Sequence, residues 1–240
     1  MQSYLVFHMH GALFAAGDTA VGEYRPSHVH PTKSGVLGLV AGAMGIRREE
    51  QDRIAKLAEA VRFSVLVLAA GNLLRDYHTV QVPSARKGQR LFTRREELLQ
   101  PDLNTILSTR DYRQDALFRV ALNSDDEELL KQIGESLQRP VFAPYLGRKS
   151  CPPALPFHPE LVHAGSVMEA MKKVELPMSD LLKPLIPEDT VYFQLFTEDR
   201  PASGTRAEFQ RRDRLIHRGN WQFGERSEFL IEMEAADVFQ

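Results

Sequence analysis

The sequence contains one cysteine, no long apolar run and almost no net charge. Cys151 alone excludes an internal disulfide and a thiolate-rich zinc site. No apolar run is long enough to span a bilayer, and the first residues lack the cationic leader of a signal peptide, so we expect a cytoplasmic protein with no membrane partner. The formal charge of −2 gives no global sign of nucleic-acid binding, so any basic surface must be local.

The most unusual stretch is "RPSHVHPTKSGVLGLVAGAMGIRREE", residues 25–50, which contains a glycine-rich helix. Its glycines, Gly35, Gly38, Gly42 and Gly45, recur at helical spacing although each costs roughly 1 kcal/mol relative to alanine. A side of a helix without side chains lets a second backbone or a nucleic-acid strand come very close. Tight packing against a sheet explains the stripe equally well, so both interpretations stay open.

The start of this helix is a candidate anion site. The first backbone N–H groups, the Lys33 ammonium and the hydroxyls of Thr32 and Ser34 come together there, and either hydroxyl can cap the helix. The stretch is not a Walker loop, because no glycine precedes the lysine in the required order.

Hydrophobic periodicity predicts strands and helices in a βαββαβ order with an insertion between the second and third strands. Ser124 and Glu127 form the capping box that begins the second main helix. This order predicts an α+β, ferredoxin-like fold. The expected elements are a strand at 3–10, the glycine helix, a helix at 49–60, a strand from 61, a hairpin or long loop over 71–115, a strand at 116–122, a helix over 125–138, an irregular stretch over 152–187, and strands at 190–196, 205–217 and 227–235.

Positive charge is concentrated in two runs. Residues 75–95 carry a net charge of +5 and residues 200–218 a net charge of +4, although the whole chain is nearly neutral. Segregated charge of this kind suits phosphate groups. A solvated arginine-rich surface would explain either run alone, whereas both runs in a ferredoxin-like frame favour RNA.

Two pairs of histidines have the spacing of metal ligands on a strand. His8 and His10, and likewise His28 and His30, place two rings on one face, but no aspartate or glutamate is clearly paired with them. We therefore predict no metal site and no cofactor.

Two further motifs carry chemistry that suits RNA. "RDYHTV" contains Tyr77 and His78, which with Lys87 are the candidates for metal-independent RNA cleavage, or else stack on a base and contact a phosphate. "PYLGRKSCP" places Arg148 and Lys149 in a turn whose backbone is approached closely. Its cysteine has no neighbouring base and is expected to be a small packing residue.

Three motifs in this order, "GEYRPSHVHPTKSGVLGLVAGAMGI", "LRDYHTV" and "PYLGRKSCP", closely resemble the CasD family, the family-five CRISPR-associated proteins of type I-E Cascade. The likeness is strong over 3–80 and 116–152, loose over 81–115 and weak beyond 160. Family members often have a tryptophan in the first loop, where Phe14 stands here.

The resemblance implies a single domain, 1–240, with an RRM-related palm at 1–74 and 116–240, a β-hairpin thumb at 75–115 and additional C-terminal strands. It implies a non-catalytic subunit that holds the 5′ handle of the CRISPR RNA and caps the backbone filament. Implied partners are the family-seven, CasC-like backbone subunit, which the thumb contacts, and the CasA-like large subunit, which reads target DNA. The RNA-binding residues expected from the motifs and the resemblance are Arg25, Thr32, Lys33, Ser34, Gly38, Arg75, Tyr77, His78, Arg86, Lys87, Tyr145, Gly147, Arg148 and Lys149.

Two rival functions follow from the same residues. A related subtype uses its family-five protein as a metal-independent endoribonuclease that matures the CRISPR RNA. A protein–protein adaptor would instead show no salt-dependent affinity for RNA.

Overall fold

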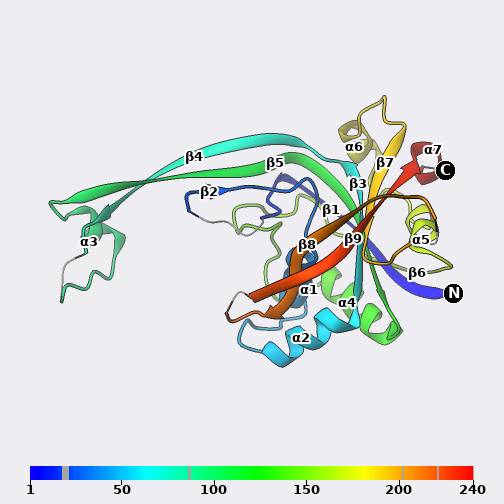
Figure 1. The fold of residues 1–240 in the computed structure, drawn as a ribbon, viewed down its shortest axis with the longest axis horizontal. Helices are drawn as coiled ribbons and strands as arrows, with labels where there is room; N and C mark the ends of the chain where they lie inside the picture. The colour runs from blue at the N-terminus through cyan, green and yellow to red at the C-terminus, as the bar shows by residue number, and fades with distance from the viewer. Residues whose placement is uncertain (18–21, 86–87, 202, 221, 240) are drawn as a thin grey trace.

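The computed structural model describes residues 1–17, 22–85, 88–201, 203–220 and 222–239, and its main feature is one large, mostly antiparallel sheet (Figure 1). The strand order along the sheet is β6-β1-β5-β3-β7-β9-β8, while β2 and β4 also pair with β5. The strands are β1 Gln2–Phe14, β2 Tyr24–Arg25, β3 Arg62–Ala69, β4 Asn72–Pro83, β5 Leu103–Ser124, β6 Glu160–Ala164, β7 Tyr192–Thr197, β8 Thr205–His217 and β9 Gln222–Glu234.

Helices cover both faces of this sheet and bury two hydrophobic cores. Along β1, Leu5, Phe7 and Met9 point into one core, while Tyr4 and Val6 point into the other, as the period of two requires. The first core lies under α1, α2 and α4 and the second under α5 and the C-terminal helices (Figure 1). The helices are α1 Lys33–Ala43, α2 Gln51–Ala60, α3 Arg94–Leu98, α4 Glu127–Gln138, α5 Val167–Lys173, α6 Ser179–Leu182 and α7 Ala235–Val238, with a 3-10 turn at Lys183–Leu185.

The β4–β5 pair leaves the sheet as a two-stranded ribbon that projects far from the rest of the molecule (Figure 1). Its register runs from Asn72 opposite Gln114 to Pro83 opposite Leu103. We call Asn72–Pro83 with Leu103–Gln114 the thumb ribbon. The sequence left a hairpin or a long loop open for this region, and the structure has the hairpin. Because β5 continues from the ribbon into the sheet as one 22-residue strand, the ribbon is built directly onto the core.

Two local expectations were wrong. The N-cap of α4 is Asp126, whose side chain accepts from the Leu129 N–H, whereas Ser124 accepts from the N–H of Asp126 and lies outside the helix. The stretch 152–187 is irregular only in its first part, because β6 adds to the edge of β1 and Ser166 caps α5. Pairing with β1 is a tertiary effect that local proline content does not reveal.

In the described part of the chain, no helix is long and apolar enough to cross a membrane.

A histidine and an arginine are buried together where β1 pairs with β5. The Arg119 guanidinium is 0% exposed and its Nε donates to His8 Nε2 at 2.9 Å. Burial, helped by the positive charge of Arg119 and by His158, lowers the pKa of His8 to about 3. His8 is therefore neutral in the folded protein and accepts a hydrogen bond from a cation.

This pair predicts a loss of stability in acid. Below pH 6.5 His8 binds a proton in the unfolded chain, whereas in the native state it binds one only near pH 3. The free energy of unfolding therefore falls as pH decreases across this window. One such proton contributes a slope of about 1.4 kcal/mol per pH unit. His8→Gln keeps an acceptor but does not titrate, so urea unfolding at pH 6 and pH 4 should show a shallower decline for the variant. Identical declines would contradict the assignment.

Candidate nucleic-acid interface

The glycine stripe of α1 is an open surface. Gly35 and Gly38 are exposed and Gly42 is half-buried, and a Cβ built at Gly38 or Gly42 meets no atom within 4 Å. The other side of the helix, with Leu37 and Val40, is buried in the first core. The packing interpretation of these three glycines is therefore wrong within the described chain, since no neighbouring element covers them. We call Gly35, Gly38 and Gly42 the glycine face.

The start of α1 is already filled by side chains of the protein itself. The Lys33 N–H donates to Asp213 Oδ2 at 2.7 Å, and Thr32 accepts from the N–H of Gly35 as the expected cap. Lys33 is only 9% exposed, and its ammonium lies 2.9 Å from both Glu198 Oε2 and the Val61 carbonyl. The predicted anion site is thus occupied by two internal carboxylates, which gives Lys33 a structural role.

Those carboxylates belong to a buried ionic cluster that ties α1 to the C-terminal hairpin. Arg226 contacts Asp213 at 2.6 Å, Glu228 at 2.8 Å and Glu198 at 3.3 Å. Arg211 also pairs with Glu228 at 2.8 Å. Part of the positive charge of the run at 200–218 is therefore paired with carboxylates inside the protein.

A second cluster, at the base of the thumb ribbon, holds Arg75. Its guanidinium makes two hydrogen bonds to the buried Asp111, at 2.9 and 3.2 Å, and Tyr24 donates to the same carboxylate at 2.6 Å. The hydrogen bond from Arg75 is the main cause that lowers the pKa of Asp111, despite burial. Arg75, expected to contact RNA, therefore joins the two strands of the thumb ribbon to each other and, through Tyr24, to β2.

Arg148 also makes its contacts within the protein. Its guanidinium lies 4.4 Å from the centre of the Tyr112 ring and donates to the carbonyls of Asp111 and Arg25 at 3.1 and 3.3 Å. The side chains of Arg25 and Lys149 remain exposed, and Ser34 is half-buried beside Thr32. Of the two cations in the "GRKS" turn, only Lys149 extends into solvent.

Gly147 is approached closely, but by this chain. It has φ +88°, and a Cβ there would lie 1.7 Å from the Ala15 carbonyl oxygen. Gly147→Ala should therefore lower the free energy of unfolding by more than about 3 kcal/mol, measured by urea unfolding, or prevent folding.

Gly204 is the matched control for that substitution. It has φ +83°, and a Cβ there would meet no atom of the described chain within 4 Å, so Gly204→Ala bears only the backbone cost of about 1–2 kcal/mol. Equal losses in the two variants would show that the contact with Ala15 is not tight.

Tyr77 and His78, the two proposed cleavage residues that the structure describes, do not converge. Tyr77 and His78 are neighbours on β4 and so point to opposite faces of the ribbon; Tyr77 is 61% exposed and His78 pairs with Asp76. Arg86 and Lys87 lie outside the described residues. The geometry favours contact roles for Tyr77 and His78 over joint acid–base catalysis.

One aromatic residue of the candidate interface was missed in the sequence. Phe142 is 44% exposed and Tyr145 is 41% exposed, in a loop whose backbone bonds to the end of α1: the Phe142 N–H donates to the Gly42 carbonyl at 3.3 Å. In the sequence, two prolines flank "VFA" and restrict its backbone, which indicates a rigid loop. Phe14, the expected aromatic of the first loop, is instead buried against Phe118.

The histidine pairs lie in internal contacts. His28 and His30 both contact Arg211, while His10 bonds the Ala116 carbonyl. Among residues whose placement is described, no group of three or more His, Cys, Asp or Glu side chains is arranged to hold a metal ion.

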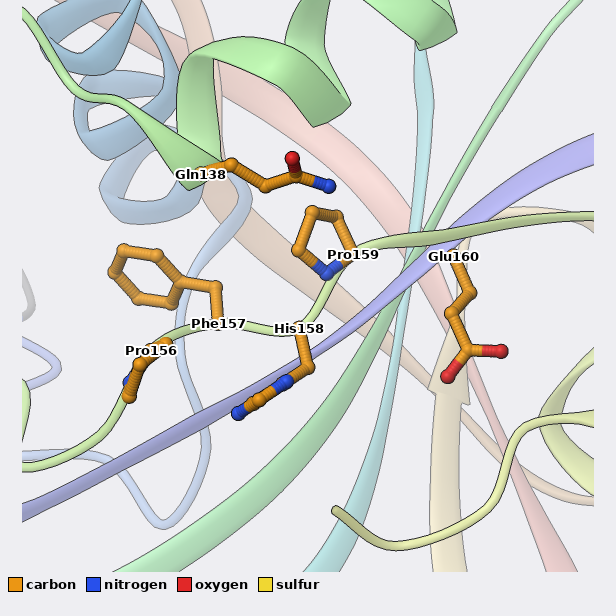
Figure 2. A pocket seen from close by; sticks show the side chains of 6 residues that line it. All are labelled: Gln138, Pro156, Phe157, His158, Pro159 and Glu160. Carbon is orange, nitrogen blue, oxygen red and sulfur yellow. The ribbon is translucent and has the colours of Figure 1, made fainter.

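A hollow of about 320 Å³ lies between the end of α4 and the segment that enters β6. Figure 2 shows His158 and Glu160 extending away from the Gln138 amide, so these polar groups do not converge on one point. Convergent polar groups are typical of a small-molecule site, and the hollow does not have that arrangement.

Comparison with known proteins gives concordant matches. A family described as CRISPR-associated protein (Cas_Cas5) matches residues 4–228. The Escherichia coli K12 protein "CRISPR system Cascade subunit CasD" is 32% identical over 185 residues, which are 73% of this chain and 78% of that protein. A chain of the solved "CRISPR RNA-guided surveillance complex" has a TM-score of 0.66 at 24% identity, covering 96% of this chain and 89% of its own. A second structure, "Crystal structure of Cas protein", has a TM-score of 0.60 at 24% identity, covering 99% and 98%.

Proposed function

The chain belongs to the CRISPR-associated Cas5 family, and on this basis we propose that it is a non-catalytic RNA-binding subunit of a type I-E Cascade surveillance complex. It acts in antiviral defence as part of a ribonucleoprotein. In this proposal it works in the cytoplasm, holds the repeat-derived 5′ handle of the CRISPR RNA and caps the backbone filament.

The observation that carries the proposal is the uncovered glycine face. A helix side without side chains, which no element of the described chain covers and which lies beside exposed aromatics, is suited to an RNA backbone that comes close to the helix. The connectivity β1-α1-α2-β3 and β5-α4-β6, with each helix-linked strand pair separated by one strand, supports a ferredoxin-like, RRM-related palm.

The thumb ribbon is proposed to dock on the CasC-like backbone subunit. It exposes large apolar side chains along its length and at its tip, a pattern typical of a protein contact. The CasA-like large subunit would bind nearby and read target DNA, so DNA contact by this chain is indirect. The exposed apolar residues of the ribbon and tip are Leu73, Val80, Phe92, Leu98, Leu99, Ile106 and Leu107.

A copurification experiment tests the proposal. RNA extracted from the purified full chain, or from its complex, should contain CRISPR RNA whose repeat-derived 5′ end is protected from nuclease. Incubation with precursor RNA in chelator should give no cleavage. Cleavage that disappears in His78→Ala would support the endoribonuclease instead, and no salt-dependent RNA binding at all would support the adaptor.

A further inference from the structure

The thumb ribbon leaves the sheet through a bend that both of its strands share. Asp115 in β5 has φ +57°, and Gly71, which precedes β4, has φ +68°. Asn72 pairs with Gln114, so the two left-handed residues lie at the same level of the two strands. Because both strands turn at one level, β4 runs in a different direction from β3, and the bend sets the direction in which the ribbon projects (Figure 1).

A bend that contains glycine is often a hinge, but this one is braced by its neighbours. A Cβ built at Gly71 would collide with the Gln114 carbonyl oxygen and lie 3.0 Å from the Ala116 nitrogen, so the two strands are in tight contact at the bend. Along the other edge of β5, β1 pairs with residues on both sides of the bend, Gly11 with Ala116 and Leu13 with Gln114. A swing of the ribbon would break this pairing, so β1 resists it.

Arg148 holds the base of the ribbon beyond the end of β1. There β2 pairs with β5, with Arg25 opposite Arg110. The Arg148 guanidinium bridges these two strands, because it donates to the carbonyl of Arg25 at 3.3 Å and to that of Asp111 at 3.1 Å. The same group lies 4.4 Å from the centre of the Tyr112 ring. A planar guanidinium makes these three contacts at once, whereas an ammonium group does not have the required shape.

The turn that carries Arg148 is itself fixed to the main sheet. Leu146 is buried in the first core, and its carbonyl accepts from the Ala15 N–H, just after β1, at 3.1 Å. The Leu146 N–H donates to the Cys151 carbonyl at 2.7 Å, which closes the turn. Arg148 therefore connects an anchored turn of the main sheet with the base of the ribbon.

We propose that the bend is a fixed joint, and that Asp115 and Arg148 are positioning residues that hold the thumb ribbon in one direction before any partner binds. The consequence for assembly rests on the proposed docking of the ribbon on a backbone subunit. A ribbon that is already aligned loses little conformational freedom on binding. From Asp115 to Leu103 the ribbon is a lever of roughly 40 Å, so a swing of about 10° would move its tip by about 7 Å.

Distances between two spin labels test the joint in the free chain. Thr105→Cys on the ribbon and Gln132→Cys on α4 place labels at exposed positions, and the buried Cys151 is left unlabelled. Double electron–electron resonance should give one narrow distance distribution for the doubly labelled chain. Arg148→Met should broaden it by several ångströms, as a swing of about 10° implies. Lys149→Met, at the exposed neighbour in the same turn, is the matched control and should leave the width unchanged.

Asp115→Gly tests the bend without removing a side chain of the turn. Glycine adopts φ +57° without strain, so the chain should melt as cooperatively as the wild type, but glycine also adopts other conformations and should broaden the distribution. The conservative variant Arg148→Lys should restore the narrow width only in part. Asp115→Gly should also bind the backbone subunit with CRISPR RNA about 10-fold more weakly, because the ribbon must then be ordered on binding.

The outcomes separate the joint from the proposed function. A broad or double distribution in the otherwise unchanged chain, or the same narrow width in both Arg148→Met and Asp115→Gly, overturns the joint. A broadened Asp115→Gly that assembles with wild-type affinity overturns the positioning role. A narrow distribution in a chain that binds neither the backbone subunit nor CRISPR RNA overturns the proposed function and leaves the joint standing.

Discussion

Leucine in place of Gly38 is expected to remove RNA binding while leaving the protein folded. The position is exposed and a Cβ there has no neighbour within 4 Å among the described residues, so the isolated chain accommodates the side chain. Replacing glycine inside a helix even adds up to about 1 kcal/mol of stability. In the complex the same side chain would occupy the space of the RNA backbone. We expect affinity for handle-containing RNA, measured by fluorescence anisotropy, to fall at least about 30-fold, equivalent to about 2 kcal/mol.

Two further variants make this result specific. Gly38→Ala adds only a methyl group and should reduce affinity by less than the leucine variant while raising the melting temperature. Ala60→Leu adds a leucine at an exposed position of α2 and should bind RNA as the wild type does. If Gly38→Leu binds normally, the glycine face does not contact RNA, and the stripe needs another explanation.

The parts of the interface that the sequence predicts well are local. Glycine spacing within one helix and the cap at Thr32 depend on residues close together in the chain. The exposed Tyr145 and Lys149 belong to the same category, since a short proline-flanked turn has few ways to bury long side chains.

The contacts of the cations were harder to predict from the sequence, because their partners are remote in the chain. Lys33 meets Glu198 across 165 positions, and Arg75 meets Asp111 across 36. In the sequence, a cation next to hydroxyls or an aromatic ring suggests a phosphate site. In the structure, a carboxylate from a remote segment binds the cation instead. The prediction that 152–187 is irregular was wrong for the same reason, since β6 forms by pairing with β1.

Trimming the thumb ribbon should abolish incorporation into the ribonucleoprotein without unfolding the palm. His78 lies opposite Ser108 in the β4–β5 register, so replacing 79–107 with Asn-Gly closes a two-residue hairpin at that pair. None of the described residues of 79–107 is buried, and the Arg75–Asp111–Tyr24 cluster stays intact below the cut. The trimmed chain should melt cooperatively within a few degrees of the wild type, yet fail to copurify with the backbone subunit and CRISPR RNA.

A shorter trim distinguishes the tip from the shaft of the ribbon. Joining Gln81 to its partner Thr105 through Asn-Gly removes the α3 region. Most of the β4–β5 strand pairs, with their exposed side chains, are kept. If the tip carries the contact, through Phe92 and Leu99, both trims lose assembly; if the shaft carries it, only the longer trim does. Normal assembly of the longer trim would refute the thumb assignment. Loss of a cooperative melt would show that 79–107 supports the core, although its described side chains are at least partly exposed to solvent.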